Sequence, residues 1–201
     1  MTDRRFDNRS QDTFKKDIKF GTAVENHLFK RWVDSCHQNG TILNDWSHNG
    51  VDNNGEFVET GKKTSGADFR VTMEYLGIDY DDVPMEFKWV PTRGKFTLKS
   101  GDVKAYIKEE SNILFVYNNN WSYNLRKPKD SSGIDDHLER IDFAIKNRYI
   151  KWGVLTYKNL CRLRDDYADK VKPIPYMGNK PGFVLEYTDY AQYFVEEPFY
   201  V

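Results

Sequence analysis

The sequence has little cysteine and no long apolar run. Its two cysteines, Cys36 and Cys161, lie far apart and fit no metal-ligand spacing, so we expect reduced, buried thiols. No stretch approaches the roughly 18 apolar residues that a membrane span needs. Residues 1–19 are too polar for a secretory signal. These absences predict a cytoplasmic protein with no membrane partner.

Motifs that would indicate ATP binding or zinc coordination are also missing. Gly61-Lys-Lys-Thr64 is similar to the end of a phosphate-binding loop, but Glu56 stands in the place of its first glycine. The four histidines lack the spacing of zinc ligands. The sequence therefore gives no indication of ATP-driven or zinc-dependent chemistry.

The chain does contain enough apolar and aromatic side chains for one packed domain. Apolar residues make up 39% of the 201 residues and aromatic residues 15%, with a mean hydropathy of −0.77. Disordered chains have few aromatic residues, so this share predicts a packed core. We expect a single domain over residues 1–201, beginning with a polar arm at residues 1–19.

The net charge of −1 conceals blocks of one sign. Residues 88–108 hold six basic side chains against Asp102, and residues 140–164 hold seven against Asp142. Segregation of this kind can give a neutral protein a surface for anionic ligands. Charged residues on solvated helix faces are an equally good explanation of the same pattern.

Hydrophobic periodicity predicts an α/β protein with a mixed sheet flanked by helices. Apolar and polar residues alternate over residues 68–75 and 84–90, which predicts two strands with a turn at 77–82. The other predicted elements are helices at 22–38, 100–110, 134–145 and 159–167, and a strand at 113–117. Residues 173–181 are predicted as a loop, and residues 44–66 as a loop or a loop with a short hairpin. Residues 150–157 fit a strand or a helix, and the aromatic tail fits an edge strand or a dimer contact.

Asp68, Glu86 and Lys88 form the most informative group of polar residues. Strand alternation places Glu86 and Lys88 on one face, and Asp68 joins them if the two strands pair. Two neighbouring carboxylates repel each other and favour a hard divalent cation such as Mg²⁺ between them. A metal-bound water and an adjacent lysine are suited to phosphodiester hydrolysis. The alternative is an exposed strand face on which Glu86 pairs with Arg70 or Lys88.

Ser65-Gly-Ala-Asp-Phe69 followed by Met85-Glu-Phe-Lys88 resembles the PD-(D/E)XK nuclease superfamily. Gly21-Thr-Ala-Val-Glu25 is similar to the acidic segment on the first core helix of many members. The resemblance implies the restriction-endonuclease-like fold, whose mixed sheet has an α-β-β-β-α-β core. Residues 20–118 would form the catalytic core, and residues 119–201 a C-terminal helical and aromatic extension.

The resemblance also implies the roles of individual residues. Asp68, Glu86 and the backbone carbonyl of Phe87 would bind the metal, which is expected to be Mg²⁺ with Mn²⁺ as a substitute. Lys88 would be the catalytic lysine, and Glu25 would act as a catalytic water-positioning group or an accessory metal ligand.

The sequence departs from the family pattern at two positions. Ala67 precedes Asp68, where a proline often stands. Asp102 stands where many exonucleases of the family have the glutamine of Gln-x-x-x-Tyr, although Tyr106 is present. The position of Ala67 tolerates variation, whereas the departure at Asp102 favours an endonuclease over an enzyme that handles strand ends.

Basic residues near the predicted core are candidates for contacts with DNA phosphates. The predicted nucleic-acid-binding residues are Lys95, Lys99, Lys104, Arg126 and Lys127. Trp121 and Tyr123 lie beside the last two and are suited to stacking on bases, or to packing on the core.

The predicted function is a magnesium-dependent DNA endonuclease that acts without further domains. Only six alanines among many Asn, Lys and Tyr suggest an AT-rich genome, such as that of a phage. One alternative is a Holliday-junction resolvase acting as a homodimer. The other is a non-catalytic nucleic-acid-binding protein of the same fold.

Overall fold

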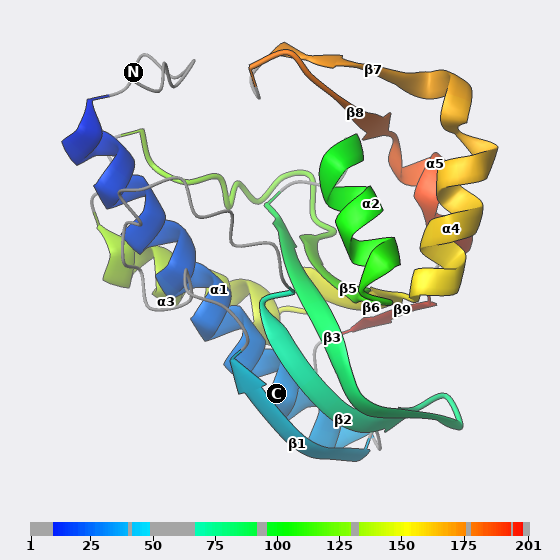
Figure 1. Ribbon diagram of the computed structural model, residues 1–201. Helices are drawn as coiled ribbons and strands as arrows, with labels where there is room; N and C mark the ends of the chain where they lie inside the picture. The colour runs from blue at the N-terminus through cyan, green and yellow to red at the C-terminus, as the bar shows by residue number, and fades with distance from the viewer. Residues whose placement is uncertain are drawn as a thin grey trace.

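The computed structural model describes residues 10–39, 42–48, 67–91, 96–129, 133–175, 178–193 and 195–198. Figure 1 shows helices on both sides of a central sheet. The helices are α1 (Gln11–Asn39), α2 (Ser100–Lys108), α3 (Ile134–Lys146), α4 (Tyr157–Asp166) and α5 (Tyr187–Tyr190), with short 3₁₀ segments at Ala168–Lys170 and Ala191–Tyr193. The strands are β1 (Ile42–His48), β2 (Phe69–Tyr75), β3 (Ile78–Val90), β4 (Phe96–Lys99), β5 (Asn112–Asn118), β6 (Ile150–Leu155), β7 (Val171–Ile174), β8 (Lys180–Leu185) and β9 (Val195–Pro198).

The central sheet is mixed, as the sequence predicted. Its six strands lie in the order β1-β2-β3-β5-β6-β9. β3 and β5 are parallel and joined through α2, and the other neighbouring pairs are antiparallel. A second sheet of three strands has the order β4-β8-β7.

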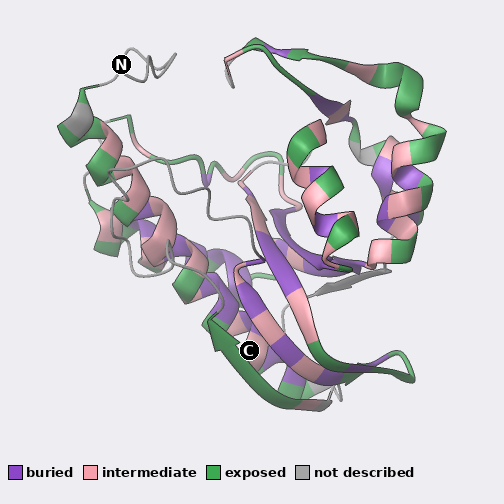
Figure 2. Ribbon diagram, in the orientation of Figure 1, coloured by how far each residue is buried: buried purple, intermediate pink, exposed green. Residues whose placement is uncertain are grey.

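Two apolar clusters cover the two faces of the central sheet. One contains side chains of α1 and α3, including Trp32 and Ile141, packed on β2, β3, β5 and β6. The other contains side chains of α2, α4 and the small sheet, including Leu160 and Phe183. β5 is buried along its whole length because it lies between these layers, whereas the described side chains of β1 are largely exposed (Figure 2).

Helix α1 begins earlier than the sequence predicted. Ser10 caps it, because the Ser10 hydroxyl accepts a hydrogen bond from the backbone N–H of Thr13 at 3.2 Å. Residues 11–19 of the predicted polar arm are therefore helical, and residues 1–9 lie outside the described residues. The four-residue apolar spacing continues to the other end of the helix, where Trp32 and Cys36 are fully buried.

Several predicted elements are confirmed, and the structure decides the form of two segments that the sequence left ambiguous. The strands at 68–75, 84–90 and 113–117 and the helices at 100–110, 134–145 and 159–167 are present with small changes of boundary. Residues 150–155 form a strand, and the aromatic tail contributes the edge strand β9. The predicted turn at 77–82 is shorter, because β3 already starts at Ile78.

The predicted loop at 173–181 is only partly correct, because residues 173–174 belong to strand β7 and residues 180–181 to strand β8. Proline lacks an N–H for a strand ladder, so a proline-rich segment reads as a loop. In the hairpin Pro173 lies directly opposite Pro181, so both missing donors fall at the same position of the ladder. Part of the predicted loop at 44–66 also forms strand β1, and residues 49–66 lie outside the described residues.

Two further predictions concern cysteines and membranes. Cys36 and Cys161 are both free thiols, as expected, but Cys161 is only half-buried. Among the described helices, none is long and apolar enough to cross a lipid bilayer.

Candidate active site

The pairing of β2 with β3 brings Asp68 next to Glu86. Phe69 lies opposite Met85 in the antiparallel register, so the residue before Phe69 meets the residue after Met85. The backbone N–H of Phe87 donates a hydrogen bond to Oδ2 of Asp68 at 2.9 Å. This bond fixes the Asp68 carboxylate at the start of β2, where the sequence could place it only conditionally.

Glu86 and Lys88 lie on the face of β3 that α2 covers. Met85 and Phe87 pack into the opposite cluster with α1, which confirms the predicted alternation. The Lys88 ammonium donates to Oε1 of Glu86, and the two groups form an ion pair. Glu86 is only 6% exposed, so both its charge and its hydrogen-bonding capacity must be satisfied within the protein.

Tyr106 of α2 is a member of this site whose role the sequence did not reveal. Its hydroxyl donates a hydrogen bond to Oε1 of Glu86 at 2.6 Å, and its ring centre lies 5.8 Å from the Lys88 ammonium. Tyr106 and Val103 lie on the buried face of α2, and their spacing of three residues was the available signal. Asp102, on the same helix, pairs with Lys99 at 3.4 Å rather than with the site.

Glu25 approaches the group from α1. It is half-buried, one turn before the buried residues Leu28 and Phe29. Burial, together with the negative charges of Asp68 and Glu86, raises the pKa of Glu25 to about 7 against the opposing effect of Lys88. Glu25 thus interacts electrostatically with Asp68, Glu86 and Lys88, the group that strand alternation had identified.

The site carries more negative than positive charge. Burial and the neighbouring charge of Glu86 raise the pKa of Asp68 to about 6, although Lys88 and the hydrogen bond from Phe87 act in the opposite direction. Burial alone would lower the pKa of Lys88, but Glu86, Tyr106 and Asp68 together outweigh it, and the pKa of Lys88 is raised. Lys88 is therefore an ammonium ion at neutral pH, facing three carboxyl groups.

The carboxylate oxygens of this site are chemically suited to bind a hard divalent cation. Carboxylate oxygens are the ligands that Mg²⁺ prefers, and a cation would favour the ionised forms of Glu25 and Asp68, whose pKa values are raised by burial and by neighbouring negative charge. Within the described part of the chain, however, no three His, Cys, Asp or Glu side chains are arranged around a common metal position. Lys88 and Tyr106 both donate to Oε1 of Glu86, so a metal at that oxygen would compete with these two contacts.

The alternative ion pairs weighed from the sequence are partly present. Glu86 does pair with Lys88. Arg70 pairs instead with Asp82 across the β2–β3 hairpin at 2.8 Å, and so does not contact Glu86.

The predicted nucleic-acid-binding residues lie in two places. Lys99 and the exposed Lys104 are at the start of α2, and Lys95 lies outside the described residues. Arg126 is exposed in the segment between β5 and α3, and Lys127 of that segment forms an ion pair with Asp17 of α1.

Comparisons with known proteins identify no relative. No family model matches the chain, and neither the curated proteins nor the solved structures include a significant match.

Proposed function

We propose that the protein is a metal-dependent nuclease that hydrolyses phosphodiester bonds of DNA within the strand. The observation that carries this proposal is the convergence of Glu25, Asp68, Glu86 and Lys88 from three elements that are separate in the sequence. A protein that only binds nucleic acid has no need of three carboxyl groups around one lysine. Such a cluster leaves negative charge unpaired in a partly buried position, which lowers the stability of the fold.

The order of elements also supports a restriction-endonuclease-like fold. α1 is followed by three neighbouring strands of the central sheet, then by α2 and by β5, which returns beside β3. This is the α-β-β-β-α-β order that the resemblance to PD-(D/E)XK nucleases implies, with β1 as the first of its three strands. β4 interrupts the order but belongs to the second sheet.

In this proposal each residue has a distinct task. Asp68, held by the N–H of Phe87, and Glu86, held by the hydroxyl of Tyr106, present carboxylate oxygens to the metal together with the Phe87 carbonyl. Glu25 positions a water molecule and accepts its proton. Lys88 remains charged and stabilises the negative charge that develops on the phosphate.

A bound Mg²⁺ would act as a Lewis acid that makes a water molecule more acidic and offsets charge on the phosphate. The raised pKa values of Glu25 and Asp68 indicate that the protein part of the site lacks this positive charge. A cation at Oε1 of Glu86 would compete there with the Lys88 ammonium and the Tyr106 hydroxyl.

The test is a cleavage assay with the full chain. Supercoiled plasmid, single-stranded DNA and a four-way junction are incubated with the protein in Mg²⁺ or in EDTA. We expect cutting in Mg²⁺ alone, and a loss of roughly 100- to 1000-fold in rate for Lys88→Ala, as is typical when one group that stabilises transition-state charge is removed. Preference for the junction would identify a resolvase.

A matched variant makes the assay specific to this site. Lys172→Ala removes an exposed lysine of β7, and its rate should equal that of the unmodified protein. Equal cutting by the Lys88→Ala protein would show that this site is not responsible. Absence of Mg²⁺-dependent cutting on all three substrates would reject the proposal and leave the non-catalytic alternative.

A further inference from the structure

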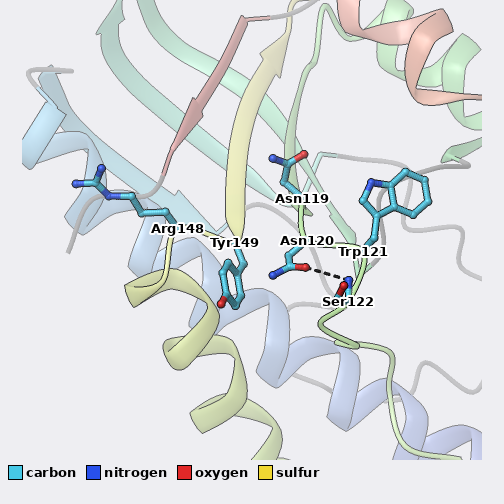
Figure 3. A pocket seen from close by; sticks show the side chains of 6 residues that line it. All are labelled: Asn119, Asn120, Trp121, Ser122, Arg148 and Tyr149. Carbon is cyan, nitrogen blue, oxygen red and sulfur yellow. Dashed lines mark hydrogen bonds between the residues drawn. The ribbon is translucent and has the colours of Figure 1, made fainter.

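A second polar pocket lies beyond the end of β5. It has a volume of about 300 Å³, at the lower end of the range for small-ligand sites. Its lining comes from two segments that are distant in the sequence: Asn119, Asn120, Trp121, Ser122, Arg148 and Tyr149. Figure 3 shows Arg148 on one side of the pocket and Trp121 on the other, with the asparagines and Tyr149 between them.

Trp121 and Arg148 are both exposed at this pocket, where their side chains are available to bind a ligand. Trp121 is 73% exposed, which is unusual for the largest apolar side chain. Arg148 is also exposed, and its guanidinium forms no ion pair with any residue in the described part of the chain. An exposed indole is suited to stacking on a planar ring, and a guanidinium is suited to pairing with a phosphate.

The backbone around the pocket is held in place by a dense set of hydrogen bonds. The buried side chain of Asn118 donates to the carbonyls of Pro91 and Tyr123 and accepts from the N–H of Asn120. Asn120 in turn accepts from the N–H of Ser122 at 2.9 Å (Figure 3). The exposure of Trp121 therefore belongs to a fixed loop conformation.

The opposite side of the pocket is fixed as well. Arg148 follows the end of α3 with a φ of 58°, at the left-handed position where glycine is the usual residue. The N–H of Asn119 donates to the carbonyl of Tyr149 at 2.6 Å, which joins the two segments. The Tyr149 ring packs against Tyr123 and Phe143. Both recognition groups are thus presented from a pre-formed frame, which lowers the entropic cost of binding.

The pocket and the candidate active site lie at different levels of the paired strands β3 and β5. Glu86 and Lys88 lie opposite Ile113 and Phe115 in the register, whereas the pocket begins at Asn119, just past the end of β5. The four residues from Phe115 to Asn119 span about 13 Å of extended chain. This length corresponds to about four nucleotides along one strand of a duplex.

We propose that this pocket binds an unpaired nucleotide of the DNA substrate, a few nucleotides from the bond that is cut. The base stacks on Trp121, beside the amides of Asn119 and Asn120. Arg148, whose side chain extends away from Trp121 on the far side of the pocket, pairs with a phosphate of a neighbouring nucleotide. The assignment of DNA as ligand rests on the proposed nuclease function. It predicts a preference for substrates with single-stranded or frayed segments over fully paired duplex.

The test measures binding in EDTA, so that its result does not depend on cleavage. Fluorescence anisotropy with a labelled single-stranded oligonucleotide and a blunt duplex of the same sequence gives both affinities. Loss of one base–aromatic stack weakens binding about 5- to 100-fold, so we expect Trp121→Ala to weaken single-strand binding by this factor and duplex binding much less. Trp121→Phe should retain most of the affinity.

The contribution of the Arg148 charge is tested separately from that of the Trp121 ring. Arg148→Ala should weaken single-strand binding and lower the slope of log affinity against log salt by about 1. Lys146→Ala removes an exposed charge two residues away that does not line the pocket, and serves as the matched control.

The outcomes separate the pocket from the catalytic proposal. Unchanged single-strand affinity in Trp121→Ala, equal effects of Arg148→Ala and Lys146→Ala, or no binding of the oligonucleotide would overturn the pocket assignment, whatever the cleavage assay shows. Binding lost in the pocket variants but without Mg²⁺-dependent cutting would support the pocket and reject the nuclease.

Discussion

Replacement of Glu25 by glutamine is expected to stabilise the protein above neutral pH and to leave its stability unchanged in acid. Glu25 is half-buried beside Asp68 and Glu86, and these surroundings raise its pKa from 4.5 to about 7. Below pH 4.5 the folded and unfolded chains both hold the proton. Glutamine is a neutral side chain of almost the same shape, and so imitates the protonated form at every pH.

The sign and size of the effect follow from proton linkage. Between pH 4.5 and about 7 the folded chain holds a proton that the unfolded chain has released, so its unfolding free energy falls as the pH rises. Above pH 7 neither state holds the proton and the loss is complete. Since one pKa unit corresponds to about 1.4 kcal/mol, ionisation of Glu25 costs the folded protein about 3 kcal/mol.

Urea unfolding followed by tryptophan fluorescence measures this difference at several pH values. We expect Glu25→Gln to exceed the unmodified protein by up to about 3 kcal/mol at about pH 8 and to match it at about pH 4. Glu139→Gln, on the exposed face of α3, is the control and should show no such dependence. A difference that does not change with pH would refute the account of Glu25.

Magnesium provides a second readout of the same residue. A cation that binds the folded state stabilises it by mass action, so Mg²⁺ at about pH 8 should raise the unfolding midpoint of the unmodified protein. The increase should be smaller in Glu25→Gln, because the variant has one carboxylate fewer. Equal increases in both proteins would argue that Glu25 does not contribute to the metal site.

Two further predictions concern single contacts. Tyr106→Phe removes the hydroxyl that donates to the buried Glu86 and should lower the unfolding free energy by about 1–3 kcal/mol; an unchanged urea midpoint would contradict the role given to this hydrogen bond. Gly182→Ala places a Cβ 2.5 Å from the carbonyl oxygen of Leu98 in the neighbouring strand β4, and should cost about 1–3 kcal/mol in the same assay. Normal stability of this variant would show that the small sheet is more loosely packed than the structure indicates.

Local patterns of the sequence predicted the elements that depend on their own residues. The alternation of apolar and polar residues around Glu86 and Lys88 predicted that both lie on one face of the strand, because successive side chains of an extended strand point to opposite sides. The apolar spacing in α3 and α4 gave two helices for the same reason. The β7–β8 hairpin was missed, because prolines disfavour a strand in isolation; here Pro173 lies in β7 at the edge of the small sheet, opposite Pro181.

Contacts between segments that are distant in the sequence could not be predicted from these local patterns. The start of α1 depended on one capping hydrogen bond of Ser10, at a position where the apolar pattern is weak. Tyr106 was visible as a buried residue of α2, but its bond to Glu86 depends on how α2 packs against β3. The polar pocket was equally inaccessible, since it joins the segment after β5 to the end of α3.

The sequence by itself determined which side chains are available on each strand and helix: Glu86 with Lys88 on one face of β3, and Glu25 on the helix before them. Only the tertiary structure decided that Asp68 lies beside Glu86, that Glu25 shares their electrostatic field, and that Trp121 and Arg148 line one pocket. The physical reason is that periodicity follows from the geometry of a single segment. Strand register and helix packing instead follow from the burial of apolar side chains contributed by the whole chain.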